Sequence, residues 1–268
     1  VLARAGHHVT VADKSTELGG RSVLESRLFG LSAWSRVADY RLYQLRQMAN
    51  VDLYTESEID ADAVAEMDVD HTFVATGAHW LSNGLGSTHF EPIEGFEQAS
   101  MSVDAIIKGA KPDGPVVIYD DEHYYMGNVI AAHLARIGND VTLVTPQPYV
   151  AGWMGYTLEQ PRVTKQLTEL GVKIVPNAVA TKWNEALHLQ DASTGASLAS
   201  LFGTLVPVGL RAPNLSLWTS ISGSENGTLL GDAEAPGIIQ SAVFAGHKAA
   251  RKFLNDGIEP AIKRERGM

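Results

Sequence analysis

Short apolar runs alternate with longer amphipathic stretches along most of the chain. Runs rich in Val, Ile, Leu and Thr, bounded by glycine, proline or acidic residues, are typical of strands buried on both faces of a parallel sheet. The expected strands are residues 9–12, 51–55, 70–75, 116–119, 141–144, 172–175, 187–189, 200–208 and 229–230. The expected helices, from apolar positions three and four apart, are 33–48, 128–137, 160–170 and 239–254. This alternation predicts an α/β protein with a parallel sheet.

The start of the chain has the pattern of the second half of a βαβ dinucleotide-binding unit. Residues 1–6 are expected to be the last turns of a helix that ends at Gly6, and the strand 9–12 ends at the acidic residue Asp13. The strand and G-x-G-x-x-G turn of the first half have no counterpart. We therefore expect a first nucleotide-binding domain that lacks its initial strand. The alternative is a protein that naturally starts with a helix.

A second unit begins with the strand 116–119 and keeps the order strand, turn, helix, strand. A pyrophosphate site at such a turn needs glycines and free backbone N–H groups. The turn instead carries Asp120, Asp121 and Glu122, and the strand 141–144 is followed by Thr145 and Pro146 rather than an acidic residue. Carboxylates repel a pyrophosphate, so we expect this unit to keep the fold without binding a dinucleotide. A metal site formed by residues 120–123 is the alternative.

Other sequence motifs narrow the chemistry further. Residues 84–89 resemble the beginning of a G-x-G-x-x-G run, but the sixth position is His89 and the segment does not join a strand to a helix, so we discard it. No nucleophile elbow, P-loop or H-E-x-x-H motif occurs, and the histidines lack metal spacing. The sequence therefore predicts no catalytic residue and no metal ligand in this chain.

Composition excludes several classes of protein. The chain has 268 residues, 45% hydrophobic and 19% charged, which is ordinary for a globular protein of one or two domains. Its net charge of −10 disfavours binding to nucleic acid or an anionic membrane, and no apolar window is long enough to span a bilayer. Without cysteine it cannot supply thiolates to an iron–sulfur cluster. We expect a cytoplasmic protein, and the segment 263–266 to be a solvated charged end.

The order of elements resembles that of the two-dinucleotide-fold flavoproteins. The pieces that carry this resemblance are Asp13, residues 19–21, residues 74–77 and residues 231–232. More specific segments, residues 119–127, 156–160, 231–236 and 75–80, are similar to the C-terminal half of the trimethylamine and dimethylamine dehydrogenase family. The likeness covers nearly the whole chain. It implies two Rossmann-like nucleotide-binding domains: 1–110 and 219–268 as the first, FAD/ADP-binding type, and 111–218 as the second, NAD(P)-binding-like and without ligand.

The resemblance also implies a function for the longer protein. In that family an N-terminal TIM barrel carries covalent FMN and a [4Fe-4S] cluster, demethylates an amine oxidatively, and passes electrons to an electron-transferring flavoprotein. The resemblance implies ADP or FAD in the first domain and a homodimer at full length. FMN and the cluster are expected only in the barrel, so this chain alone is expected to be inactive.

The family's site residues carry over onto eight positions. Asp13 matches the acidic residue that accepts from the adenosine ribose, with Lys14 beside it, and Gly20 and Arg21 match the segment near the phosphates. Ala75, Thr76 and Gly77 match the turn that packs against the nucleotide. Asp232 matches a residue that touches the flavin ribitol in flavin-binding relatives. The alternative is a strand-end turn residue for Asp13 and a helix N-cap before Pro236 for Asp232.

Two other functions compete with this interpretation. One is an NAD(P)H-dependent reductase of the dienoyl-CoA reductase type, against which the acidic residues 120–122 argue. The other is a non-catalytic structural or docking module. The sequence does not choose among trimethylamine, dimethylamine, histamine or N-methylated amino acids as the substrate.

Overall fold

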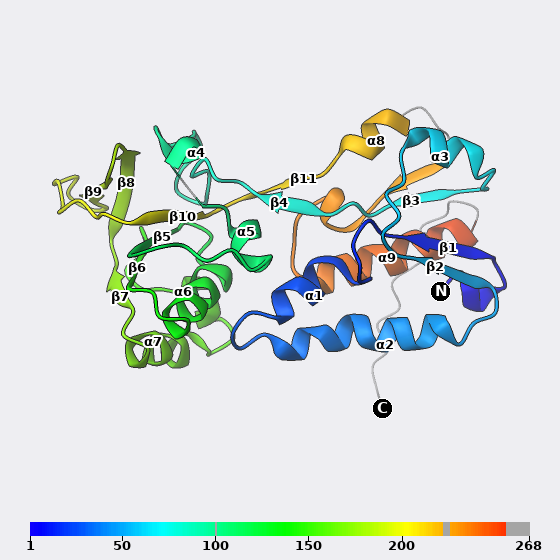
Figure 1. The fold of residues 1–268 in the computed structure, drawn as a ribbon, viewed down its shortest axis with the longest axis horizontal. Coiled ribbons are helices and arrows are strands. Elements are labelled where there is room, and N and C mark those ends of the chain that lie inside the picture. Colours follow the sequence, from blue (N-terminus) through cyan, green and yellow to red (C-terminus); the bar gives the residue numbers. More distant parts are fainter. Residues whose placement is uncertain (100, 222–225, 256–268) are drawn as a thin grey trace. The chain divides into compact units, whose positions relative to one another are not determined.

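The computed structural model describes residues 1–99, 101–221 and 226–255, and it shows an α/β protein with parallel sheets (Figure 1). The chain forms two compact units. Unit 1 comprises residues 1–23, 34–78 and 213–268, and unit 2 comprises residues 24–33 and 79–212. The chain therefore passes from one unit to the other at residues 23–24, 33–34, 78–79 and 212–213, whereas the sequence placed its domain boundaries at 110–111 and 218–219. Those domain boundaries stay a prediction.

Unit 1 contains two separate parallel sheets of two strands each. Its strands are β1 (Val9–Ala12), β2 (Val51–Tyr54), β3 (Thr72–Val74) and β12 (Gly227–Leu229). Its helices are η1 (Ala3–Ala5), α2 (Ser35–Arg46), α3 (Ala61–Glu66), α8 (Ser216–Ile221), η4 (Gly231–Ala233) and α9 (Ile239–Leu254). β1 pairs with β2, and β3 pairs with β12. The sequence predicts a missing strand between β1 and β3, and within the described chain these two strands belong to different sheets.

Unit 2 is built on a four-stranded parallel sheet of order β10-β5-β6-β7. These strands are β5 (Val116–Asp120), β6 (Val141–Val144), β7 (Lys173–Val175) and β10 (Thr204–Val208). The hairpin strands β8 (Ala178–Trp183) and β9 (Leu187–Asp191) are antiparallel. Its helices are α4 (Phe96–Ala99), α5 (Val103–Ile107), α6 (Met126–Arg136), η3 (Gly152–Gly155) and α7 (Gln160–Glu169). η2 (Ser32–Trp34), α1 (Gly20–Ser26), β4 (Ala78–Trp80) and β11 (Arg211–Pro213) lie where the chain passes between units.

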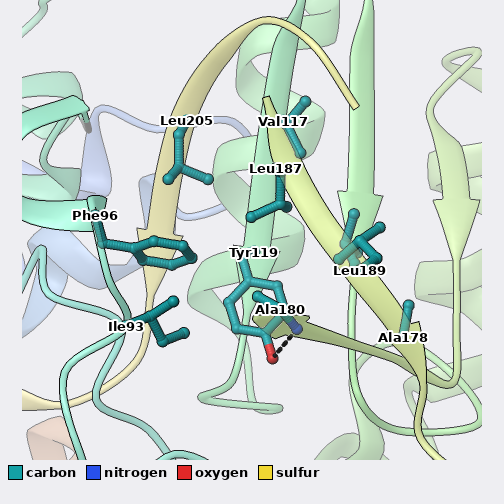
Figure 2. Close-up of a cluster of buried hydrophobic side chains, with 10 residues drawn as sticks. Ile93, Phe96, Val117, Tyr119, Ala178, Ala180, Leu187, Leu189 and Leu205 are labelled. Atoms are coloured by element: carbon teal, nitrogen blue, oxygen red, sulfur yellow. Dashed lines mark hydrogen bonds between the residues drawn. The ribbon is translucent and has the colours of Figure 1, made fainter. Parts of the chain in front are cut away.

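The core of unit 2 lies between the four-stranded sheet and the β8–β9 hairpin (Figure 2). Every residue of β5 is buried, as expected for a central parallel strand covered on both faces. Tyr119 of β5 points toward the hairpin, and its hydroxyl accepts a hydrogen bond of 3.2 Å from the backbone N–H of Ala180. Because this N–H is buried, the tyrosine hydroxyl satisfies a donor that would otherwise be unpaired. Burial raises the pKa of Tyr119, so the hydroxyl stays neutral.

Most expected elements are present, with boundaries shifted by a few residues. The strands 9–12 and 141–144 and the helix 239–254 have the expected bounds. Two elements were not expected: β8, which pairs with β9 in a hairpin, and α1, which follows the glycine turn. Of β3, only Val74 is buried, so that strand is less covered than expected. The charged segment 263–266 lies outside the described residues. Within the described residues no helix is both long and apolar enough to cross a membrane.

Candidate nucleotide-binding site

The turn after β1 holds the first pair of predicted site residues. Oδ1 of Asp13 accepts a hydrogen bond of 2.8 Å from the N–H of Ser15, which closes an Asx turn. Nζ of Lys14 lies 3.6 Å from Oε1 of Glu58, and both of these side chains are largely exposed. The Asx turn gives Asp13 the turn role that the sequence left as an alternative. A carboxylate has two oxygens, so the same side chain keeps capacity to accept from a ribose hydroxyl.

Gly19 and Gly20, where α1 begins, have different surroundings. Both have positive φ, 122° at Gly19 and 56° at Gly20. A Cβ at Gly19 would lie 2.5 Å from Cγ2 of Val23 and 2.7 Å from Cβ of Ala38, so close packing excludes a side chain there. A Cβ at Gly20 would meet nothing within 4 Å. Gly20 therefore leaves its backbone open to a ligand, as expected for a nucleotide-binding turn.

Arg21 and Asp232 contact each other directly within unit 1. Their closest atoms, Nη2 of Arg21 and Oδ2 of Asp232, are 3.3 Å apart. Nη2 of Arg21 also donates to the carbonyl of Gly237 at 2.9 Å, and the N–H of Gly237 donates to Oδ1 of Asp232 at 2.9 Å. Asp232 lies in η4, while the N-cap of α9 is Ile238, which makes no side-chain capping bond. The N-cap alternative for Asp232 is therefore wrong, because its carboxylate binds Gly237 and Arg21 before the helix begins.

The turn after β3 lies next to this ion pair. The pairing of Leu229 with Val74 places residues 231–232 beside residues 75–77, since both segments follow paired strands at the same end. Gly77 has φ 77° and open space at its Cβ position. Oγ1 of Thr76 donates to the carbonyl of Asn214 at 2.6 Å, and the N–H of Asn214 donates to the carbonyl of Gly77 at 2.8 Å. The structure thus brings Arg21 and Asp232 into contact and places residues 75–77 and 231–232 at the same end of a strand pair, while no described contact links Asp13 or Lys14 to them.

Unit 1 also contains a cavity that the sequence did not predict. Its volume is about 730 Å³, and none of the eight predicted site residues lines it. The lining residues are Thr16, Glu17, Leu18, Val23, Asp39, Leu42, Tyr43, Arg46, Gln47, Leu53 and Thr55. These residues come from the segment after β1, from α1, and from α2 and β2 with the residues that follow each of them, and no local motif marks them. Only the packing of α2 on the sheet could reveal the cavity.

In unit 2 the buried carboxylate of Asp121 is surrounded by hydrogen-bond donors. It accepts from the backbone N–H groups of Thr88 and His89, both at 3.0 Å. Nδ1 of His89 lies 3.2 Å and Nε2 of His123 lies 3.0 Å from its oxygens. Burial alone would raise the pKa of Asp121, but the hydrogen bonds from His123, His89 and Thr88 outweigh it and lower the pKa. Asp121 is therefore a carboxylate at neutral pH. Its role in the structure is to bind the loop 84–89, which contains Thr88 and His89.

This arrangement bears on the metal alternative for residues 120–123 and on the discarded glycine segment 84–89. The described residues contain no group of three or more His, Cys, Asp or Glu side chains placed to hold a metal ion, so the metal alternative for residues 120–123 has no support there. The discarded glycine segment 84–89 turns out to contribute the loop that binds Asp121. Sequence reasoning missed this contact because the two segments are more than thirty residues apart and share no motif. The consecutive small residues of the loop, which leave their N–H groups accessible, were the only signal.

Comparisons with known proteins agree with this fold. Residues 101–197 match the family model of the OYE-like second alpha/beta domain. The chain is 26% identical to dimethylamine dehydrogenase from Hyphomicrobium sp. (strain x), over 94% of this chain and 39% of that protein. Histamine dehydrogenase from Rhizobium sp. 4-9 is 34% identical, with a TM-score of 0.91 over 98% of this chain and 42% of that chain. A third relative is 6-hydroxypseudooxynicotine amine oxidase from Pseudomonas geniculata N1, at 35% identity and a TM-score of 0.90 over 94% of this chain and 39% of that one.

The chain therefore spans about two fifths of the length of these relatives, all of which are oxidoreductases by name. Both solved structures superimpose on nearly all of it at more than 30% identity. The predicted resemblance is thus confirmed: the chain is a homologue of the amine dehydrogenases and oxidases that include dimethylamine dehydrogenase.

Proposed function

We propose that this chain is the nucleotide-fold portion of a longer flavin-dependent oxidoreductase that oxidises amines. The similarity of almost the entire chain to histamine dehydrogenase and to 6-hydroxypseudooxynicotine amine oxidase carries the proposal. The amine, and the group removed from it, are determined outside this sequence. FMN and a [4Fe-4S] cluster are proposed for that other part, since a cluster needs thiolates and this chain has no cysteine.

Within this chain we propose two Rossmann-like domains, of which the first holds ADP or FAD. The open space at Gly20 and Gly77 supports this, because both backbones can be approached by a ligand. Asp13 and Lys14 would bind the adenosine end, and Gly20, Arg21 and residues 75–77 would lie near the phosphates. Asp232 is proposed to position the Arg21 guanidinium, with which it is paired. When bound, the nucleotide would stabilise the native state of unit 1.

The longer protein is proposed to act as a homodimer that passes its electrons to an electron-transferring flavoprotein. Two other functions remain as alternatives: an NAD(P)H-dependent reductase, and a module without catalytic or redox function. The acidic turn after β5 disfavours the reductase, because it places Asp120 and Asp121 where a dinucleotide would bind.

Anaerobic titration of the full-length protein tests the three functions together. The flavin absorbance is followed while dimethylamine, trimethylamine, histamine or NADH is added. We expect at least one amine to reduce the flavin and NADH to leave it oxidised. Reduction by NADH alone would overturn the proposal in favour of the reductase, and an absence of reduction by every compound would favour the non-catalytic module. The present chain alone, which lacks the barrel, is the control and should show no amine-dependent change.

A further inference from the structure

The carboxyl end of β5 is the position where a doubly wound domain binds its ligand. In the order β10-β5-β6-β7, the chain runs from β5 to one side and returns to the other, so the strand order reverses beside β5. Ligands of open α/β sheets bind in the crevice outside the strand ends at such a reversal. In unit 2 this place is taken by the acidic turn, residues 120–122, and by its neighbours.

Asp120 lies where a bound phosphate would approach the helix. Its side chain is completely buried, and Oδ1 accepts from the N–H groups of Glu122 at 3.2 Å and His123 at 3.1 Å. A Cβ at Gly127, in the first turn of α6, would lie only 2.5 Å from Cγ of Asp120. The carboxyl group of Asp120 therefore packs against the N-terminal turn of the helix, the place where this kind of turn binds a phosphate. Its Oδ2 has no hydrogen-bond partner in the described part of the chain.

Glu122 and β10, the strand next to β5, accept hydrogen bonds from further backbone N–H groups. Oε2 of Glu122 accepts from the N–H of Met126, the first residue of α6, at 3.0 Å. The N–H groups of Asp121 and Glu122 both point to the carbonyl of Val208, at the end of β10. Donors that a pyrophosphate would need are thus already bound within the protein.

Asp121 binds a second segment, the loop 84–89, to the same turn. It binds the backbone of Thr88 and His89, and the N–H of Ser87 donates to its carbonyl at 2.9 Å. A Cβ at Gly86 would lie 2.3 Å from Oδ2 of Asp121, which shows how closely this loop approaches. The N–H of Leu210, just beyond β10, donates to the carbonyl of Leu85. The loop 84–89 therefore lies against the residues that follow β5 and β10.

We propose that the acidic turn is an internal ligand of unit 2: Asp120 and Glu122 occupy the N–H groups that a dinucleotide pyrophosphate would take, and Asp121 holds the loop 84–89 beside them. The unit thereby keeps a dinucleotide-binding fold while excluding NADH and NADPH. This goes beyond the proposed function, because it holds for whichever amine or acceptor the longer protein uses.

The first test asks whether Glu122 holds the helix N-terminus. Amide hydrogen exchange of Met126 is measured in the full-length protein and in Glu122→Ala. Loss of one charge-assisted hydrogen bond should speed exchange at Met126 roughly tenfold. Glu159→Ala is the matched control, since Glu159 precedes α7 but its side chain makes no capping bond. Unchanged exchange at Met126 in Glu122→Ala would overturn the proposal.

The second test asks whether the carboxylates exclude the dinucleotide. NADH binding is measured by calorimetry for the wild type, for Asp120→Gly/Glu122→Gly and for the isosteric pair Asp120→Asn/Glu122→Gln. We expect no binding by the wild type or the isosteric variant at millimolar NADH, and affinity at least roughly tenfold higher in the glycine variant. Micromolar binding by the wild type overturns the proposal, and so does a folded glycine variant that still fails to bind. Neither readout involves an amine, so failure here is distinct from failure of the proposed function.

Discussion

Gly127 on α6 lies directly against the carboxylate of Asp120, the last residue of β5. A Cβ at Gly127 would lie 2.5 Å from Cγ and 2.6 Å from Oδ2 of that side chain, closer than non-bonded atoms approach. Because α6 and β5 both belong to unit 2, this contact fixes how the helix begins relative to the strand. The acidic residue at the end of β5 thus requires a glycine in the first turn of α6.

Gly127→Ala should destabilise unit 2 by about 1–3 kcal/mol, the cost of overpacking a buried contact. A loss of stability would identify the contact, because alanine in an exposed helix interior is favoured over glycine by about 1 kcal/mol. Urea denaturation followed by circular dichroism measures the change. Gly246→Ala in α9 is the control, since a Cβ there meets nothing within 4 Å, and it should be neutral or stabilising. Equal behaviour of the two variants would contradict the contact.

His89 should titrate above its ordinary pKa of 6.5. Burial lowers the pKa of His89, but the hydrogen bond and charge of Asp121, together with the carbonyl of Ala180, raise it by more. In Asp121→Asn the charge is removed, so the pKa should fall. NMR titration of the His89 ring proton in the wild type and in Asp121→Asn measures both values. A His89 pKa at or below 6.5 in the wild type would contradict the model of Asp121 as an anion.

The same shift predicts how stability depends on pH. A histidine whose pKa is raised on folding contributes stability that is complete below its unfolded pKa and is lost as pH rises through the folded pKa. The contribution of His89 should therefore disappear above pH 6.5. Asp120 acts in the same direction, because burial raises its pKa and its ionisation at higher pH is unfavourable. Denaturation midpoints across this range, compared between wild type and His89→Gln, should show a smaller decline in the variant.

Asp13→Ala should weaken ADP binding by the full-length protein by about 1–3 kcal/mol, the cost of leaving a ribose hydroxyl without its acceptor. Amine turnover should fall little, since the resemblance places this nucleotide away from the reacting flavin. Calorimetry with ADP measures the loss. Asp13→Asn retains an oxygen that can accept from Ser15, so it separates the ligand contact from the turn. Full ADP affinity in Asp13→Ala, or a collapse of turnover with ADP still bound, would show that the assignment of Asp13 is wrong.

Hydrogen exchange should differ sharply between the two units in the isolated chain. We expect slow exchange within residues 116–208, where a four-stranded sheet has a buried core, and fast exchange in β1. β1 and β3 each pair on one side only within the described residues, which leaves backbone groups open to water. In the proposed longer protein, if it supplies the expected strand and glycine turn, protection of β1 and ADP binding should appear together. Equal protection of both units in the isolated chain, with ADP bound, would contradict the predicted missing strand.

Much of this protein could be predicted from local sequence. The apolar run 141–144 and the amphipathic stretch 239–254 specified a strand and a helix with the observed bounds, because periodicity reports which face is buried. The acidic residues 120–122 also predict that the second unit binds no dinucleotide, and this stays a prediction. The turns at Gly19, Gly20 and Gly77 were also predicted from the sequence, and these three glycines have positive φ.

Tertiary structure decided the features that depend on distant partners. The strand β9 was expected in the second unit and lies there, but its pairing with β8 was not foreseen, since an apolar run does not state which strand it will join. The pairing of Arg21 with Asp232 joins residues more than two hundred positions apart. Asp121 likewise became the anchor of the loop 84–89 only when folding brought those N–H groups around it. The sequence by itself determined most of the helices and strands, and the tertiary structure decided which groups satisfy one another, because hydrogen bonds depend on distance in space and not on spacing along the chain.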